Sequence, residues 1–197
     1  MTELLADLPI EFIGSFPDAL HRLDPILPEI VVLGRSNVGK STLINAVVGR
    51  KIARTSSTPG KTQHLNVFRF PTFYLIDLPG YGYAKLSQAE RRRLKDLVHN
   101  TIQKRPDLAA ALWLLDIRHK LSKEDWAMHD LLADSKREAI IALTKADKLA
   151  RSKWPAAAKA RAAELEIGID DLVVTSGATG TGTEELGELI LDVVSPK

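Results

Sequence analysis

A run of small, polar and basic residues from Gly34 to Ser41 has the composition and spacing that hold a polyphosphate. The run matches the pattern GxxxxGK[ST] and consists of Gly34, Arg35, Ser36, Asn37, Val38, Gly39, Lys40 and Ser41. In such a loop the glycines let successive backbone N–H groups converge on an anion, and the following helix adds the positive end of its dipole. We expect Lys40 to reach the β- and γ-phosphates and the Ser41 hydroxyl to bind Mg²⁺. The alternative is a chance Gly-Lys-Ser in a turn, which the β-branched run before the loop and the helical pattern after it disfavour.

A second motif narrows the kind of nucleotide-binding protein. It directly follows an apolar run and consists of Asp77, Leu78, Pro79 and Gly80. These residues fit the pattern DxxG, in which the Asp holds Mg²⁺ through water and the Gly N–H meets the γ-phosphate. Kinases and simple ATPases share the first loop, so the second motif favours a switch that responds to the γ-phosphate.

A polar stretch from Arg54 to Gln63 lies between the two motifs and suits a loop that orders around Mg²⁺ and γ-phosphate. Among its hydroxyls we favour Thr62 as the metal ligand, because its Pro-Gly-x-Thr setting resembles the first switch of bacterial GTPases; Thr58 is the second choice. A solvated surface loop is the alternative. His64 is expected to have a surface role rather than a catalytic one. The residues expected to lie against the nucleotide here are Gly60, Lys61, Thr62, Gln63 and His64.

A third motif has the residue types needed to select guanine. It follows another apolar run and consists of Thr144, Lys145, Ala146 and Asp147. The Asp147 carboxylate can accept hydrogen bonds from N1–H and the exocyclic amine of guanine, whereas adenine would leave it unpaired. This asymmetry predicts GTP and GDP as ligands, with Lys145 along the base plane. A helix-capping Asp beside a surface Lys is the alternative reading of these four residues.

A fourth segment is expected at the base through its backbone. It consists of Thr175, Ser176, Gly177 and Ala178 and resembles the loop whose amide meets guanine O6, although Gly177 stands where that pattern has Ala.

Hydrolysis itself is expected to be slow. Tyr81 follows Gly80, where many GTPases carry the Gln that orients the attacking water, and Tyr cannot do this in the same way. One hypothesis is that Asn37 binds a K⁺ ion, because its place in the loop resembles that of K⁺-activated relatives; the alternative is a loop-stabilising side chain. The residues expected to act in hydrolysis are Lys40, Thr62, Gly80 and Asn37, and those expected to bind Mg²⁺ are Ser41, Thr62 and Asp77.

Alternating apolar runs and helical patterns must position these motifs, and they predict an α/β fold. We expect a P-loop NTPase G domain with a sheet of about six strands, mostly parallel with one antiparallel strand, and helices on both faces. The predicted strands are Glu29–Leu33, Leu65–Phe70, Thr72–Asp77, Ala109–Asp116, Glu138–Thr144 and Leu172–Thr175. The predicted helices are Ser41–Arg50, Ser87–Lys104 with a capping box from Ser87 and Glu90, Ser122–Ala133, Lys153–Glu166, and a last one containing Leu186 to Val194.

Length and composition limit the remaining possibilities. A chain of 197 residues is long enough for one sizeable core, so we expect a G domain at 29–197 preceded by an extension at 1–28. Its Ile10–Ile13 segment is a candidate edge strand. The absence of cysteine excludes disulfides, thiolate metal sites and a Cys nucleophile. Neither a signal peptide nor a run of roughly 20 apolar residues is present, so we expect a cytoplasmic protein without membrane insertion.

Together the motifs resemble the EngB (YihA/YsxC) family of bacterial GTPases, in the TrmE–Era–EngA–EngB superclass. The resemblance covers roughly residues 28 to 194 and is most specific in the run Asp77-Leu78-Pro79-Gly80-Tyr81-Gly82-Tyr83-Ala84-Lys85, followed later by Asp116-Ile117-Arg118-His119. Lys120 departs from the family, which usually has Pro there. The resemblance implies a GTPase that acts in assembly of the large ribosomal subunit, with precursor RNA and proteins as partners, and that is linked to cell division and septation. We expect a monomer.

A basic cluster of Arg91, Arg92, Arg93 and Lys95 follows the second motif, with Lys104 and Arg105 at the end of the same predicted helix. A solvated helix face is the ordinary interpretation, and contact with ribosomal RNA phosphates is the functional one. Two other classes of function remain open: a nucleotide-dependent interaction module in cell division with incidental hydrolysis, and an ATP-dependent kinase or ATPase, which Asp147 argues against.

Overall fold

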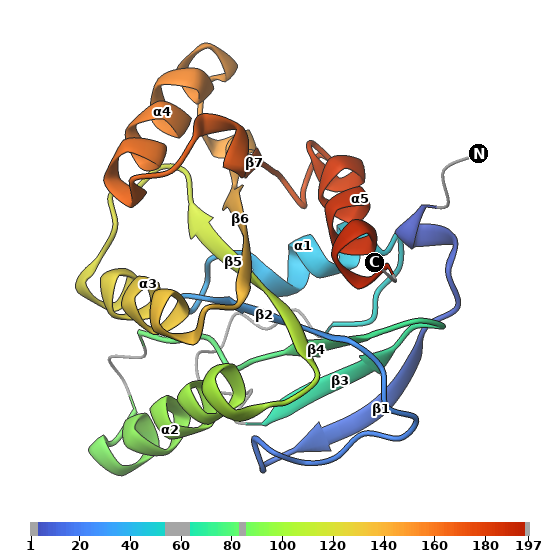
Figure 1. The fold of residues 1–197 in the computed structure, drawn as a ribbon. Helices are drawn as coiled ribbons and strands as arrows, with labels where there is room; N and C mark the ends of the chain where they lie inside the picture. Colours follow the sequence, from blue (N-terminus) through green and yellow to red (C-terminus); the bar gives the residue numbers. More distant parts are fainter. Residues whose placement is uncertain (1–3, 54–63, 83–85, 196–197) are drawn as a thin grey trace.

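The computed structural model describes residues 4–53, 64–82 and 86–195. Within them, seven strands form one sheet in the order β1-β3-β4-β2-β5-β6-β7 (Figure 1). Only β3 runs against the other strands, because it pairs antiparallel with β1 and β4 while the remaining neighbours are parallel. The strands are β1 (Glu11–Phe16), β2 (Glu29–Gly34), β3 (Leu65–Arg69), β4 (Tyr74–Asp77), β5 (Leu108–Asp116), β6 (Glu138–Thr144) and β7 (Leu172–Val174).

This sheet confirms the predicted α/β fold with a single antiparallel strand. The strand beyond the expected six is β1, which stands at the edge of the sheet and confirms the candidate edge strand at Ile10–Ile13, shifted by one to three residues. The β3–β4 hairpin was also expected, although β4 begins at Tyr74 rather than Thr72, because the turn between the strands extends through Phe73.

Helices within the described residues cover both faces of the sheet. They are α1 (Lys40–Val47), α2 (Gln88–Lys104), α3 (Lys123–Ser135), α4 (Trp154–Leu165) and α5 (Thr183–Val194), with short 3-10 turns at Leu5–Asp7, Ala146–Lys148, Arg151–Lys153 and Ile169–Asp171. The predicted capping box of Ser87 and Glu90 is confirmed at the start of α2. Helix α1 ends before the predicted Arg50, because the Asn45 carboxamide oxygen accepts hydrogen bonds from the N–H groups of Ile52 and Ala53 and folds the chain back.

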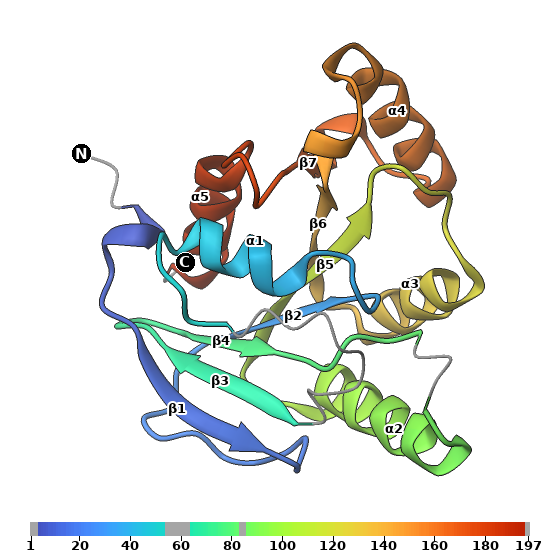
Figure 2. The ribbon, with the colours of Figure 1, turned by 180° about the vertical axis from the view of Figure 1, so that it is seen from behind.

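The central strand β2 shows how the core is divided into two layers. Ile30 and Val32 pack in the layer that contains α1 and α5, whereas Val31 and Leu33 pack in the layer that contains α2, α3 and α4. All four side chains are fully buried, which is typical of a parallel strand covered on both faces. Figures 1 and 2 show the two groups of helices on opposite sides of the sheet.

The described part of the first 28 residues packs on this framework. Leu5 and Leu8 are buried in the layer of α1 and α5, β1 pairs with β3, and the Pro25 carbonyl accepts a hydrogen bond from the Tyr74 hydroxyl at 3.0 Å. The division into an extension and a G domain stays a prediction. No helix of the described residues is long and apolar enough to cross a membrane.

Arg105 does not belong to the exposed basic cluster predicted along α2. It is buried at the amino end of the sheet, where its guanidinium donates at 2.5 Å to both carboxylate oxygens of Glu29 and at 2.7 Å to the Ala19 carbonyl. The prediction was wrong because helical periodicity alone does not show that the chain turns inward at Arg105, just after α2 ends.

Candidate functional site

The predicted motifs meet at one edge of the sheet. Five parallel strands, β2, β4, β5, β6 and β7, end there, and their ends lead into Gly34, Asp77, Asp116, Thr144 and Thr175, respectively. In open α/β sheets, ligands bind in the crevice outside the carboxyl ends of the strands. The fold therefore brings the residues of the described motifs into one candidate site.

The loop from Gly34 to Gly39 has the tight geometry expected of a phosphate-binding loop. A Cβ atom on Gly34 would lie 2.8 Å from Val38 Cγ1 and 3.0 Å from the Leu114 carbonyl oxygen, so the position excludes a larger residue. Gly39 has a φ of 101°, which L-residues rarely adopt, and Asn37 has a φ of 63°. These conformations lead directly into α1, whose first residues are Lys40 and Ser41.

Lys40 and Asp77 are brought together across this loop. The Lys40 ammonium donates to Asp77 Oδ1, and both side chains are largely buried. Ser41 follows Lys40 directly as the second residue of α1, and it is half-buried. A hydroxyl and a carboxylate are the hard oxygen donors that Mg²⁺ takes, and this ion usually keeps waters and binds substrate phosphates rather than a dedicated cluster of protein ligands. Accordingly, no group of three His or carboxylate side chains suited to a metal is present among the described residues.

The predicted first-switch stretch, from Arg54 to Gln63, lies wholly outside the described residues. This applies to Thr58, Gly60, Lys61, Thr62 and Gln63, so their roles stay predictions. His64 is half-buried immediately before β3.

Lys145 connects the phosphate loop to the end of β5. Its ammonium donates at 2.5 Å to the Asn37 carbonyl oxygen and lies 3.1 Å from Asp116 Oδ2, while its side chain passes over Gly39. Arg118 also donates twice to Asp116, at 2.8 and 2.7 Å. Although burial opposes ionisation, the hydrogen bonds from Arg118 and Lys145 lower the pKa of Asp116 to about 2. A charged Asp116 thus helps to hold Lys145 against the phosphate loop.

Asp147 is held by the loop that follows β7. The Ser176 hydroxyl donates to Asp147 Oδ1 at 2.6 Å, and this hydrogen bond is the largest cause of the lowered pKa of Asp147. Thr175 and Ser176 are fully buried, and the Thr175 carbonyl accepts from the Ala146 N–H at 3.1 Å. Hydrogen bonds of Ala146 with Thr175 and of Asp147 with Ser176 therefore join the two segments predicted to contact guanine.

Gly177 has a steric reason to differ from the Ala of the usual pattern. A Cβ atom there would lie 2.8 Å from the backbone of Thr42 and Leu43 in α1. The glycine allows the base-side loop to pack directly on the helix that carries Lys40 and Ser41. Thr144 adds a second link, because its hydroxyl donates to the Val38 carbonyl oxygen at 2.7 Å.

Three residues in this site, Asp116, Arg118 and Tyr81, were not among the predicted site residues. Asp116 and Arg118 form the network that holds Lys145, and their signal in the sequence was the Asp-Ile-Arg-His run directly after a buried strand. Tyr81 was assigned only the loss of a catalytic Gln, whereas its hydroxyl lies within hydrogen-bonding distance of Asp125 and Trp113. Nothing in the sequence around Tyr81 indicates that its hydroxyl contacts Asp125 and Trp113.

Comparisons with known proteins agree with this geometry. Residues 29–145 match the family described as "50S ribosome-binding GTPase". The chain is 44% identical to "Probable GTP-binding protein EngB" of Anoxybacillus flavithermus over 162 residues, which are 81% of this chain and 84% of that protein. It is 42% identical to the protein of the same name from Heliobacterium modesticaldum, over 91% of this chain and 89% of that protein.

Solved structures show the same fold. A crystal structure of a probable GTP-binding protein EngB superposes with a TM-score of 0.71 at 26% identity, covering 84% of this chain and 98% of that one. Aquifex aeolicus Era bound to GDP and aluminium fluoride, at 21% identity, gives a TM-score of 0.72 over 87% of this chain and 58% of that one, and it supports the fold alone. With a guanine-type motif and a phosphate loop joined at one sheet edge, and with relatives that match over most of its length, the chain belongs to the EngB family of GTP-binding proteins and is a GTPase.

Proposed function

We propose that this GTPase is a molecular switch in assembly of the large ribosomal subunit, in which GTP hydrolysis resets binding to a precursor particle. The observation that carries the proposal is the short path from the γ-phosphate motif to a basic helix. The motif from Asp77 to Gly80 starts at the last residue of β4, and α2 begins only a few residues after the motif, at Gln88. The family description, which names the 50S ribosome, supports the same partner.

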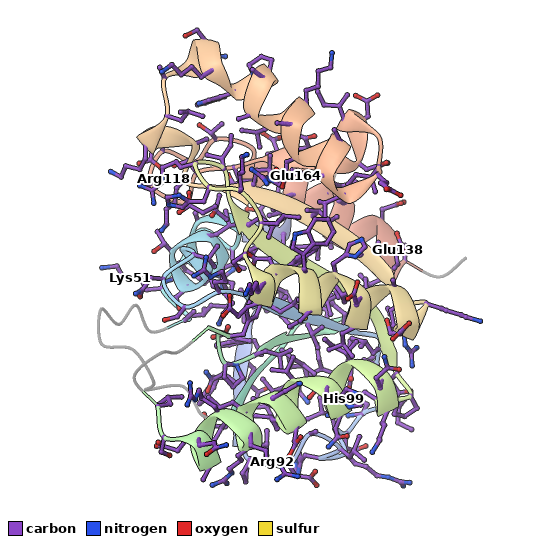
Figure 3. The ribbon with its side chains drawn as sticks, turned by 90° about the vertical axis from the view of Figure 1, so that its left-hand side faces the viewer. Lys51, Arg92, His99, Arg118, Glu138 and Glu164 are labelled. Carbon is purple, nitrogen blue, oxygen red and sulfur yellow. The ribbon has the colours of Figure 1, made fainter. Side chains whose placement is uncertain are left out.

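The basic face of α2 suits an RNA backbone. Arg91, Arg92, Arg93 and Lys95 are exposed, and Figure 3 shows Arg92 projecting from α2 away from the sheet. Within the described ranges, none of these four side chains takes part in an ion pair. Their charges are therefore available to phosphate groups, which bind cationic side chains with a strong dependence on salt.

We further propose the roles of the site residues. The phosphate loop from Gly34 to Ser41 binds the phosphates, and Asp147 selects guanine with support from Lys145 and Ser176. Ser41, Asp77 and Thr62 hold Mg²⁺, which supplies positive charge to the β- and γ-phosphates when bound. K⁺ binding by Asn37 is supported by the exposed position of Asn37 in the phosphate loop. Equal GTPase rates in Na⁺ and K⁺ buffers, with and without ribosomal particles, would contradict that last role.

The test of the ribosomal role is cosedimentation with large-subunit precursor particles in a non-hydrolysable GTP analogue and in GDP. We expect binding in the analogue only. The variant R91A/R92A/R93A should bind more weakly and should reduce the slope of log K against log salt by about 2, as expected for three lost phosphate contacts on single-stranded RNA. A matched control is Lys159→Ala, which removes an exposed charge from α4 on a different part of the surface. An unchanged salt slope in the triple variant would contradict contact between α2 and RNA.

A role in cell division and septation is the second candidate and rests on the family resemblance. Exposed apolar side chains near the amino terminus, Phe12 at 57% and Ile26 at 77% exposure, favour a protein partner at that surface. Retained binding to a division protein, together with no nucleotide-dependent binding to precursor particles, would favour this candidate. The ribosomal role as a monomer in the cytoplasm remains our first proposal.

A further inference from the structure

Tyr81 is held at its backbone by the phosphate loop. Its N–H donates to the Gly34 carbonyl oxygen at 3.2 Å, and its carbonyl oxygen accepts from the Ser36 N–H at 2.8 Å. These two bonds form an isolated parallel bridge with Arg35. The peptide unit that joins Gly80 to Tyr81 is therefore positioned directly by the loop that binds phosphate.

The side chain of Tyr81 is held by residues of β5 and α3. Its hydroxyl donates to Asp125 Oδ1 and accepts from the Trp113 indole N–H, both at 2.8 Å. Trp113 is 1% exposed and Asp125 is 4% exposed, so both partners are buried. Burial, reinforced by the negative charge of Asp125, raises the pKa of Tyr81 far above its usual value. The phenol therefore stays protonated and donates its hydrogen bond throughout the physiological pH range.

Asp125 extends this connection into α3. Its second oxygen, Oδ2, accepts from the Ser122 N–H at 2.9 Å and from the Ser122 hydroxyl at 2.7 Å, which closes the capping box of the helix. One carboxylate thus joins Tyr81 to the first turn of α3. The next residue along this helix, Trp126, is 40% exposed and lies edge-on to His129 with ring centroids 5.5 Å apart.

We propose that Tyr81 is a positioning residue that holds Gly80 for the γ-phosphate and couples the nucleotide state to α3. The inference rests on the proposed contact between the Gly80 N–H and the γ-phosphate. A Gln at this position would use its side chain on the attacking water, whereas the Tyr81 phenol is committed to Trp113 and Asp125. Tyr81 therefore connects the phosphate loop to α3 through the hydrogen bonds of its backbone and of its side chain.

The experiment compares Tyr81→Phe with the wild-type protein in two measurements. The first is the ratio of affinities for a non-hydrolysable GTP analogue and for GDP, measured with fluorescent nucleotides. We expect this ratio to fall about tenfold, because only the γ-phosphate complex needs Gly80 in place and because the lost hydroxyl leaves Asp125 Oδ1 and the Trp113 indole N–H without the partner that ties them to Tyr81. The second is the NMR signal of the Trp113 indole N–H, assigned with Trp126→Phe and Trp154→Phe. Its shift between the GDP and GTP-analogue states should be present in the wild type and lost in Tyr81→Phe.

Two control variants separate this role from a general loss of stability. Tyr74→Phe removes another buried hydroxyl, one that donates to Pro25 at the other end of β4, and should leave the affinity ratio and the Trp113 shift unchanged. Ser122→Ala breaks the capping box but keeps the bond between Tyr81 and Asp125, so its affinity ratio should match the wild type. If Tyr81→Phe does not fold, Asp125→Ala makes the same test by removing the acceptor of the phenol hydrogen bond, with Ser122→Ala as the control for the capping box that is lost with it.

A wild-type affinity ratio and a wild-type Trp113 shift in Tyr81→Phe would overturn the inference, as would equal losses in Tyr74→Phe. A wild-type protein that binds both nucleotides equally would instead overturn the proposed contact at Gly80, and the inference with it. The two failures are distinguishable, because the second appears in the wild-type protein before any substitution is made.

Discussion

The two ends of the central strands both pair acidic with basic side chains, but they do so in different ways. At the amino end, Glu29 and Arg105 form a bidentate pair in which both side chains are 4% exposed. Arg137 lies behind it and donates to the carbonyl oxygens of Arg105 and Leu108. At the carboxyl end, the pairs join separate loops, and several members are partly exposed, such as Lys145 at 27%.

The difference indicates that ion pairs stabilise the fold at the amino end and form part of the candidate ligand site at the carboxyl end. The pair at the amino end satisfies its charged groups within the protein, so it contributes to the fold and presents little to a ligand. The carboxyl-end network leaves charged groups at the surface of a crevice where phosphates and a base can displace or join existing contacts. We therefore expect substitutions at the amino end to lower stability without changing nucleotide affinity, and substitutions at the carboxyl end to disturb the nucleotide site.

Arg105→Met should have the largest effect and should act on stability. It leaves the Glu29 carboxylate buried without its partner, which is expected to lower the free energy of unfolding by about 3–5 kcal/mol. Urea denaturation measures this loss. The folded fraction should keep wild-type affinity for GDP, and a large fall in that affinity would break the proposed separation of the two ends.

Asp147→Asn should act on nucleotide affinity instead. Loss of the carboxylate would remove the two charge-assisted hydrogen bonds proposed between Asp147 and guanine, so GTP affinity should fall about 100-fold with little change in unfolding by urea. Xanthosine triphosphate should recover much of the loss, because its C2 oxygen can accept from the Asn amide. Asp170→Asn, which changes an exposed carboxylate in the turn before β7, is the matched control and should bind GTP normally.

Asp116 should make the carboxyl end sensitive to acid. Its pKa in the folded protein is about 2, below the value near 4 expected when unfolded, so its contribution is present above pH 4 and is lost as the pH falls towards 2. The contribution is about 2 kcal/mol by this difference. Urea midpoints measured from pH 5 to pH 2 should fall less steeply for Asp116→Asn than for the wild type. Parallel curves for the two proteins would contradict the network described for Lys145.

Gly177→Ala should have the smallest effect. It tests the carboxyl end by adding a methyl group rather than by removing a charge. The added methyl group would press on the backbone of α1, which is expected to cost about 1–2 kcal/mol and to weaken GTP binding by shifting Lys40 and Ser41. Gly187→Ala in α5 is the matched control, because its methyl group would meet Leu5 at an ordinary 3.4 Å. The control should be neutral or stabilising, since Ala favours a helix over Gly.

Local patterns were sufficient for much of the fold. The strand Glu138–Thr144 and the capping box of Ser87 agree with the prediction residue for residue, because strand periodicity and helix caps depend on near neighbours in the chain. Arg105 and Tyr81 show where this reasoning stops. Arg105 is buried just after α2 and Tyr81 is half-buried after Gly80. The partners that hold their polar groups, Glu29, Trp113 and Asp125, lie far away in the sequence.

The amino-acid sequence by itself determined the family and the fold class, and it predicted a phosphate loop, an Asp for Mg²⁺ and an Asp for guanine. These depend on residue types at short, fixed spacings. Only the tertiary structure decided which charges are enclosed and which remain open, that Gly177 must accommodate α1, and that Tyr81 turns inward to α3. Such outcomes arise from contacts between segments that meet only when parallel strands are brought side by side in the sheet.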